Sequence, residues 1–83
     1  MSDESRPRLT LREREIMALI ATGLNSRAIA RHLGIAYFTV RKHRSNILPK
    51  LDLHDAAELQ AFAARHFLED APSVPKSALL WVV

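Results

Sequence analysis

Basic side chains dominate the middle of the chain, and the chemistry available to them is the binding of phosphate. Between residues 16 and 51 the sequence has no Asp or Glu but contains six Lys and Arg residues: Arg27, Arg31, Arg41, Lys42, Arg44 and Lys50. Residues 1–15 balance four arginines against four acids, and residues 52–83 carry five acids against two basic residues. A basic segment between neutral and acidic flanks is typical of a surface that binds a polyanion.

The same segment has the spacing of two short helices joined by a tight turn. Within residues 26–51, Ala30 is small where a second helix would cross, and Gly34 can take the left-handed conformation that a turn needs. Apolar residues such as Ile29 and Val40 recur where the two helices would face each other. The second helix of such a pair can project from the surface and enter the major groove of DNA.

Caps and apolar periodicity predict the helices that hold this segment. Four helices are expected, over about residues 11–22, 26–33, 37–48 and 55–67. Thr10 and Glu13 form a capping box before the first helix. Because Pro49 lacks an N–H and disfavours helix at the residue before it, we expect the third helix to end or kink at about residue 48. The predicted fold is an all-α, four-helix domain over residues 9–68.

The 83 residues are predicted to form one small domain with a different segment at each end. Residues 1–8 are expected to be a flexible N-terminal arm. Residues 69–83 are a Pro-containing tail that ends in the apolar run Leu79–Val83. This run is either frayed or covers an exposed groove, and the second alternative is favoured because successive large apolar side chains are unfavourable in solvent.

The composition argues against several other kinds of protein. The chain has no Cys, which is typical of a cytoplasmic protein without disulfides. No apolar run approaches the length of about 18 residues that a membrane span needs. The four histidines lack zinc-site spacing, and no phosphate loop, paired carboxylates or nucleophile with a base partner suggests an enzyme. We therefore expect no catalytic residue, no metal, no cofactor and no membrane partner.

Several side chains near the basic segment allow more than one interpretation. Glu13 is expected to cap the first helix and to form an ion pair with Lys50 or a nearby Arg. His43 faces inward by helical period, which favours a buried, hydrogen-bonded histidine. Tyr37 and Phe38 open the third helix, and they either pack on the first helix or lie against a sugar-phosphate backbone.

Many fixed spacings resemble the LuxR/FixJ-type helix-turn-helix family, the DNA-binding module of many bacterial transcription regulators. The similarity covers about residues 8–67 without a gap. The matching elements are Leu9-Thr10-x-Arg12-Glu13-x-Glu15-Ile16, Leu19-Ile20-Ala21-x-Gly23, Ile29-Ala30-x-x-Leu33-Gly34-Ile35, Thr39-Val40-Arg41-x-His43 and Asn46-Ile47-x-x-Lys50-Leu51. Three positions besides Pro49 depart from the pattern: Ala36 replaces the usual cap of the recognition helix, Ser45 a frequent Lys, and Leu59 a small residue.

The resemblance implies that the third helix is the recognition helix and that the fourth is a dimer contact. Base contacts are implied for Arg41, Lys42 and Ser45. Phosphate contacts are expected from Arg27, Arg31, Tyr37, Thr39, Arg44 and Lys50. The dimer contact is expected at Ala57, Ala61 and Ala64, whose small side chains allow two fourth helices to approach closely.

The function that this resemblance implies is sequence-specific binding of double-stranded DNA by a stand-alone, GerE-like transcription regulator. Its expected partners are DNA, a second copy in a weak homodimer that DNA strengthens, and RNA polymerase or another regulator. The alternative is a protein-interaction module that modulates another regulator through the fourth helix or the apolar tail without contacting DNA.

Overall fold

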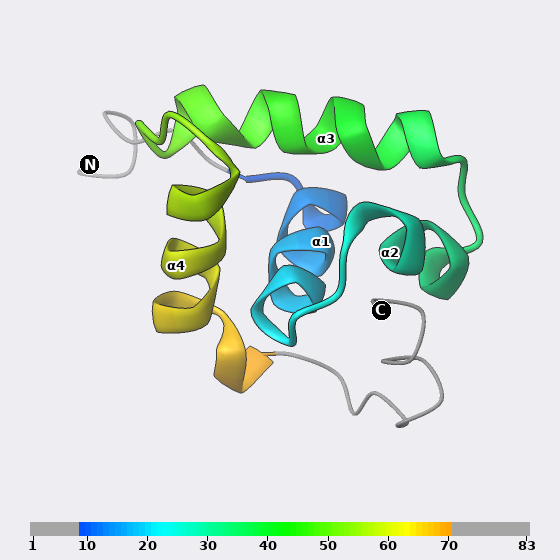
Figure 1. The fold of residues 1–83 in the computed structure, drawn as a ribbon, viewed down its shortest axis with the longest axis horizontal. Helices are drawn as coiled ribbons and strands as arrows, with labels where there is room; N and C mark the ends of the chain where they lie inside the picture. Colours follow the sequence, from blue (N-terminus) through cyan, green and yellow to red (C-terminus); the bar gives the residue numbers. More distant parts are fainter. Residues whose placement is uncertain (1–8, 71–83) are drawn as a thin grey trace.

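The computed structural model describes residues 9–70, and these residues contain four α-helices and one short 3-10 helix but no strand (Figure 1). The elements are α1 (Leu11–Ala21), α2 (Ser26–Leu33), α3 (Tyr37–Lys50), α4 (Ala56–His66) and η2 (Leu68–Asp70). The prediction of an all-α, four-helix domain is confirmed. The predicted N-terminal arm and the apolar run Leu79–Val83 lie outside the described residues.

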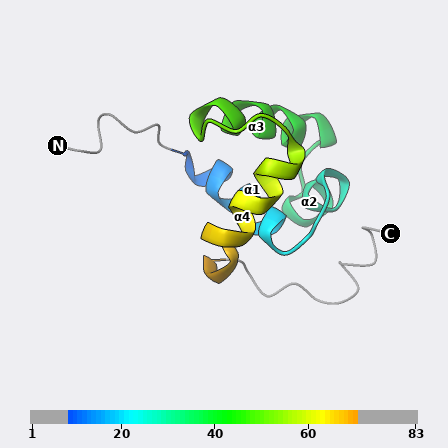
Figure 2. The same cartoon turned by 60° about the vertical axis from the view of Figure 1, so that its left-hand side comes forward.

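Helix α1 is the centre of the domain, because it contacts α2, α3, α4 and η2. Helix α3 runs along one side of the domain, and the other three helices all lie on its inner side (Figures 1 and 2). The largest fully buried side chains come from every helix and from the loop after α1: Ile16, Met17, Leu19, Ile20, Leu24, Ile29, Val40, Ile47 and Leu59. One core therefore holds α3 along one face and leaves its other face at the surface.

The helices begin at the caps that the sequence indicates, with one exception. The Thr10 hydroxyl accepts a hydrogen bond from the Glu13 N–H at 3.1 Å, and Glu13 Oε1 accepts one from the Thr10 N–H at 2.8 Å, which completes the capping box. The side chains of Asn25 and Asp55 cap α2 and α4. Helix α3 has no side-chain cap, because Ala36 occupies the N-cap position. The predicted departure at this position is confirmed.

Three helices end in a turn with a left-handed residue. This residue is Gly23 after α1 (φ 96°), Gly34 after α2 (φ 68°) and Asp52 after α3 (φ 57°). Glycine takes this conformation without steric cost, whereas an aspartate must bring its Cβ close to the backbone. Of the three helix ends, the end of α3 therefore has the most strained backbone.

The predicted end of the third helix at about residue 48 falls short, because α3 continues through Pro49 to Lys50. A kink at this proline stays a prediction. Proline cannot donate a hydrogen bond to the carbonyl of Ser45. However, Pro49 is exposed and lies in the last turn, where only this bond is lost. A residue after the proline closes the end of the helix, because the Leu53 N–H donates a hydrogen bond to the Leu48 carbonyl at 2.8 Å.

Glu13 is the one charged side chain that is buried in the described part of the chain, with 3% of its surface exposed. Lys50 Nζ donates a hydrogen bond to Glu13 Oε1 at 2.8 Å, and this ion pair ties α3 to the start of α1. Burial raises the pKa of Glu13, but the hydrogen bonds from Lys50 and Thr10 and the charges of Lys50 and His43 bring that pKa below its ordinary value. The predicted capping role and ion pair of Glu13 are confirmed.

His43 is half-buried, so the prediction of a buried histidine is wrong. Val40 and Ile47 occupy the middle of the inward face of α3 and are fully buried. His43 lies to one side of them, by about 60° around the helix axis, and therefore stands at the edge of the core.

Candidate nucleic-acid interface

The outward face of α3 carries the residues that were predicted to read bases. Because Val40 and Ile47 point into the core, residues on the opposite side of the helix must face solvent. Arg41, Lys42 and Ser45 are all exposed. Helical geometry places them within about a third of the circumference of α3. The structure thus brings the three residues together on one exposed strip of α3.

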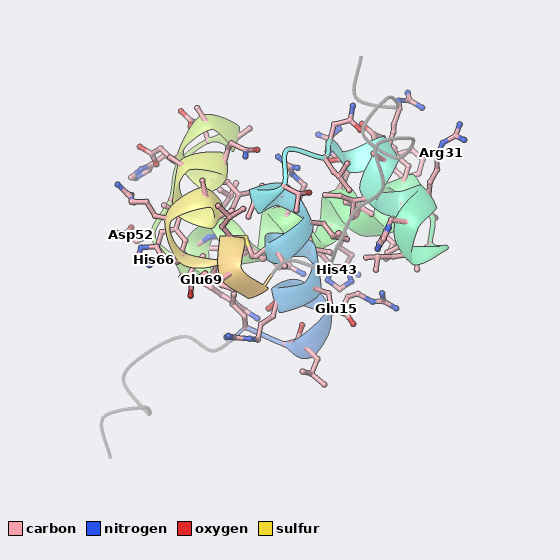
Figure 3. The ribbon with its side chains drawn as sticks, turned by 90° about the horizontal axis from the view of Figure 1, so that it is seen from below. Glu15, Arg31, His43, Asp52, His66 and Glu69 are labelled. Carbon is pink, nitrogen blue, oxygen red and sulfur yellow. The ribbon has the colours of Figure 1, made fainter. Side chains whose placement is uncertain are left out.

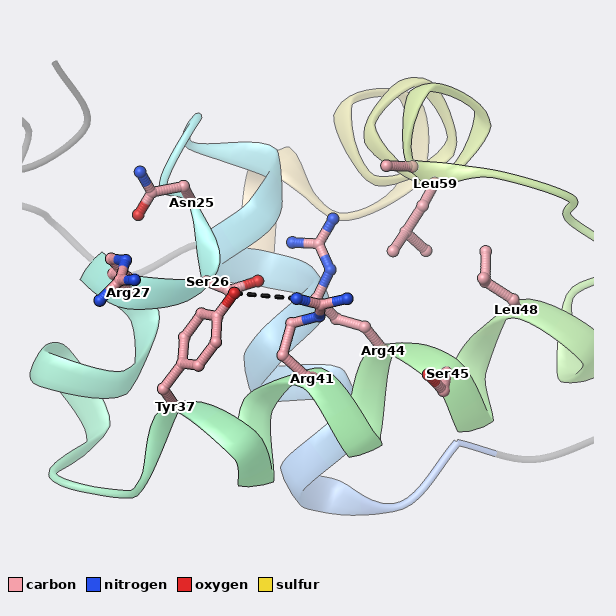
Figure 4. Close-up of a pocket in the computed structure, with 10 residues that line it drawn as sticks. Asn25, Ser26, Arg27, Tyr37, Arg41, Arg44, Ser45, Leu48 and Leu59 are labelled. Atoms are coloured by element: carbon pink, nitrogen blue, oxygen red, sulfur yellow. Dashed lines mark hydrogen bonds between the residues drawn. The ribbon is translucent and has the colours of Figure 1, made fainter.

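A hollow of about 380 Å³ lies beside this strip, between α3, the start of α2 and the start of α4 (Figure 4). Its polar lining includes Ser26, Arg27, Tyr37, Arg41, Arg44 and Ser45. Leu48 and Leu59 form its apolar end. No carboxylate is among the described residues that line it. The hollow is therefore basic, and we name it the arginine hollow after its three guanidinium groups.

Tyr37 holds two of these guanidinium groups close together. The guanidinium carbon of Arg27, from α2, lies 4.9 Å from the centre of the Tyr37 ring, and that of Arg41, from α3, lies 5.7 Å from it. Arg41 Nη1 also donates a hydrogen bond to the Tyr37 hydroxyl at 2.8 Å (Figure 4). Cation–π contact with one ring thus gathers positive charge from two helices.

Arg44, which carries the third guanidinium, is half-buried and also lines the hollow. Burial lowers the pKa of Arg44, the charge of Arg41 lowers it further, and Tyr37 opposes this change. Within residues 9–70, no carboxylate forms an ion pair with Arg27, Arg41 or Arg44. Like charges that lack a counter-ion are stabilised when an anion binds between them.

The other residues predicted to contact phosphate lie in three different settings. Arg31 is exposed on α2, on the side of the domain away from Glu69 of η2 (Figure 3). Thr39 is exposed near the start of α3. Lys50 is held against Glu13 by the ion pair described above, so its first role is in the fold. A phosphate contact of Arg31, Thr39 or Lys50 stays a prediction.

The two aromatic residues that open α3 differ in their surroundings. Phe38 is 81% exposed, so packing on the first helix is wrong for this residue. Its position, about 160° around α3 from Val40, points it away from the core. Tyr37 is half-buried, but its contacts are with the arginines of α2 and α3. A contact of either ring with the sugar-phosphate backbone stays a prediction.

Some residues that line the arginine hollow were not predicted from the sequence. Asn25 and Ser26 begin α2, and a helix start next to Arg27 was the signal that could have identified them, because helix starts favour anions. Leu48 and Leu59 carried no such signal. Leu59 is 1% exposed, and its larger side chain joins α4 to the core and to the hollow.

The three alanines of the predicted dimer contact lie on the outer side of α4. Ala57, Ala61 and Ala64 are exposed, whereas Leu59 and Ala63 on the same helix are buried against the core. The outer side of α4 is therefore open to a partner helix. Its role in a dimer stays a prediction.

The described residues contain neither a helix suited to span a membrane nor a cluster suited to bind a metal. None of the helices between residues 9 and 70 has the length and apolar character needed to span a membrane. The same residues contain no group of three His, Asp or Glu side chains that could hold a metal ion.

Known proteins share this sequence pattern. Residues 7–63 match the family described as bacterial regulatory proteins, luxR family. The chain is 47% identical over 57 residues to the uncharacterized response regulatory protein YgeK of Escherichia coli K12. It is 43% identical over 60 residues to the transcriptional regulatory protein LiaR of Bacillus subtilis 168, and equally to the response regulator protein VraR of Staphylococcus aureus NCTC 8325.

These matches cover 69%, 72% and 72% of the chain but only 39%, 28% and 29% of YgeK, LiaR and VraR, so the chain spans less than half the length of these relatives. The family match covers more than half of the chain and includes α1, α2, α3 and most of α4. The chain belongs to the luxR family of bacterial regulatory proteins, and its helix-turn-helix domain implies DNA binding.

Proposed function

We propose that this chain binds double-stranded DNA sequence-specifically in transcription regulation, with α3 in the major groove. The observation that carries the proposal is the position of the basic side chains of α2 and α3. They lie on the exposed strip of α3 and in the arginine hollow beside it, where no carboxylate of residues 9–70 lines the surface. A helix that is held by its inner face and is basic on its outer face fits the dimensions of a major groove.

Arg41 and Lys42 are the proposed readers of guanine, and Ser45 a smaller polar contact. A guanidinium or ammonium group can donate hydrogen bonds to guanine O6 and N7, which only the major groove presents together. Arg41 donates a hydrogen bond to the Tyr37 hydroxyl through Nη1. A guanidinium has five N–H donors, so the others can form charge-assisted hydrogen bonds to a guanine.

We propose that the arginine hollow binds DNA phosphates next to the bases that Arg41, Lys42 and Ser45 contact. Arg27, Tyr37 and Arg44 surround it, and Arg31 and Thr39 extend the same contact along α2 and α3. Each phosphate that these groups neutralise releases counterions, so affinity must fall as salt rises. Phosphate contacts supply affinity and orientation, whereas the residues of α3 supply the preference for sequence.

The outer side of α4 is the proposed contact between two copies on an inverted repeat. The small side chains of Ala57, Ala61 and Ala64 permit close approach of two helices, but a single short helix buries little area. The dimer is therefore expected to be weak alone and to be strengthened by DNA. RNA polymerase or another regulator is the proposed further partner of the DNA-bound form.

The test begins with selection of duplexes from a random pool, followed by Kd measurements by fluorescence anisotropy. With about five phosphate contacts, the affinity of the chain should fall about 10²–10³-fold between 50 and 200 mM KCl. Arg41→Ala should weaken the selected site by about 1–3 kcal/mol and relax the preference at one base pair. The matched control is Arg14→Ala, which removes the same charge from an exposed position on α1, away from the arginine hollow and from the alanines of α4, and should leave the Kd unchanged.

A failure to enrich any sequence, with binding that is weak on all duplexes, would contradict the proposal. It would favour the alternative that the sequence left open, a protein-interaction module that acts without contact to DNA.

A further inference from the structure

Phe38 is a large apolar side chain that the fold does not use. It is 81% exposed, although most other aromatic rings of the described residues are at least partly buried. Its ring contact within the described residues is edge-on with Tyr37, at 5.8 Å between centroids and an interplanar angle of 63°. A phenyl ring in water carries a hydration cost that apolar contact would remove. The ring is therefore available for a partner.

The position of Phe38 places this ring among the DNA-reading residues. It is the second residue of α3, and Lys42 and Ser45 follow it one and two turns later on the same face. Side chains in a helix lean toward its N-terminus, so the ring lies at the N-terminal end of α3. In helix-turn-helix proteins this end of the recognition helix contacts base edges.

The major groove offers one apolar group to such a ring. Bases present hydrogen-bond donors and acceptors there, and thymine adds its C5-methyl group. Neighbouring Arg41 and Lys42 can satisfy the polar edges, whereas a phenyl ring can bind none of them. The apolar partner that fits the ring in this setting is therefore a thymine methyl.

We propose that Phe38 is a specificity-determining residue that reads a thymine through its methyl group; this inference rests on the DNA binding proposed above. The contact buries about one methyl-sized group, which corresponds to about a fourfold change in Kd. Replacement of Phe38 should leave the fold intact, because its ring lies outside the core.

The test replaces each thymine of the selected duplex by deoxyuridine, which removes the methyl group and keeps every hydrogen-bonding group. We expect one such replacement to weaken binding of the full 83-residue chain about fourfold and to leave binding of Phe38→Ala unchanged. The matched control is Leu11→Ala, which removes an apolar side chain that is 82% exposed on α1. This variant should keep the full effect of the thymine-to-deoxyuridine change. Equal melting temperatures of the variants by circular dichroism establish that the fold is retained.

Two results overturn the inference, and they are distinguishable from each other. If the chain binds selected DNA but every replacement affects the wild type and Phe38→Ala equally, the ring contacts the sugar-phosphate backbone or nothing, and DNA binding stands without a thymine contact. If the chain enriches no duplex at all, the DNA-binding proposal fails and the thymine contact fails with it.

Discussion

At the scale of single residues, Glu13 stabilises the fold in two ways, as the cap of α1 and as the ion-pair partner of Lys50, and the contribution of its charge depends on pH. Its carboxylate caps α1 and accepts the hydrogen bond from Lys50 at 2.8 Å. The pKa of Glu13 lies below its ordinary value of 4.5, so the charged form is favoured by folding. The stability that this charge contributes is fully present above pH 4.5 and is lost as pH falls through the lower pKa of the folded state.

Glu13→Gln should therefore lower the free energy of unfolding by about 1 kcal/mol at pH 7, because glutamine keeps the capping hydrogen bond but not the charge. The difference from the wild type should shrink below pH 4.5 and disappear at the acid end of the titration. Urea unfolding across this pH range measures it. Glu15→Gln is the control, since Glu15 pairs with Arg12 on the surface at 3.2 Å and should change stability little at any pH. A constant difference between wild type and Glu13→Gln at all pH values would contradict the role of the charge.

At the scale of elements, the ends of the helices differ in strain although they have similar turns. Asp52 holds φ 57° after α3, whereas Gly34 holds φ 68° after α2. Within residues 9–70, no atom beyond Gly34 and its neighbours in the chain lies within 4 Å of the place that a Cβ of residue 34 would occupy, so a substitution there tests the backbone conformation. Substitutions at these two positions therefore measure the free energy that a side chain costs when its residue has left-handed backbone angles.

Asp52→Gly should raise the free energy of unfolding by about 0.5–1 kcal/mol, because it removes the strain at the end of α3. Gly34→Ala should lower it by about 1 kcal/mol for the converse reason. Thermal unfolding of both variants checks the pair. If Asp52→Gly lowered the melting temperature instead, a favourable interaction of the Asp52 carboxylate would have to outweigh the strain.

At the scale of the whole molecule, the proposed DNA contact and the proposed dimer contact lie on different helices. The exposed strip with Arg41, Lys42 and Ser45 belongs to α3, and the exposed alanines belong to α4. Ala61→Arg should leave the melting temperature unchanged, since Ala61 is exposed, but should weaken binding to a two-half-site operator at least about fivefold by blocking close approach of two helices. Affinity for a single half-site is the internal control and should not fall. Unchanged stoichiometry and affinity on the double site would exclude α4 as the dimer contact.

The sequence by itself determined the helices and their caps, because these depend on bonds between neighbours in the chain. Thr10 and Glu13 are three residues apart, and the turn at Gly34 needs only a residue that tolerates a positive φ. The outward position of Arg41 also followed from helical period alone. The error in the predicted end of α3 at Pro49 is local as well. How much a proline destabilises a helix depends on whether it falls in the interior or in the last turn, and the sequence alone does not place the helix end to within two residues.

Only the tertiary structure decided which residues from different helices meet. The Lys50–Glu13 hydrogen bond joins residues that are 37 apart in the chain, and periodicity offered Lys50 or several arginines equally as partners of Glu13. The gathering of Arg27 and Arg41 on Tyr37, and the exposure of Phe38, depend on how α3 is rotated against α1 and α2. That rotation is set by the joint packing of a core from all four helices, and the free energy of such packing depends on the shape of the whole core rather than on any one segment.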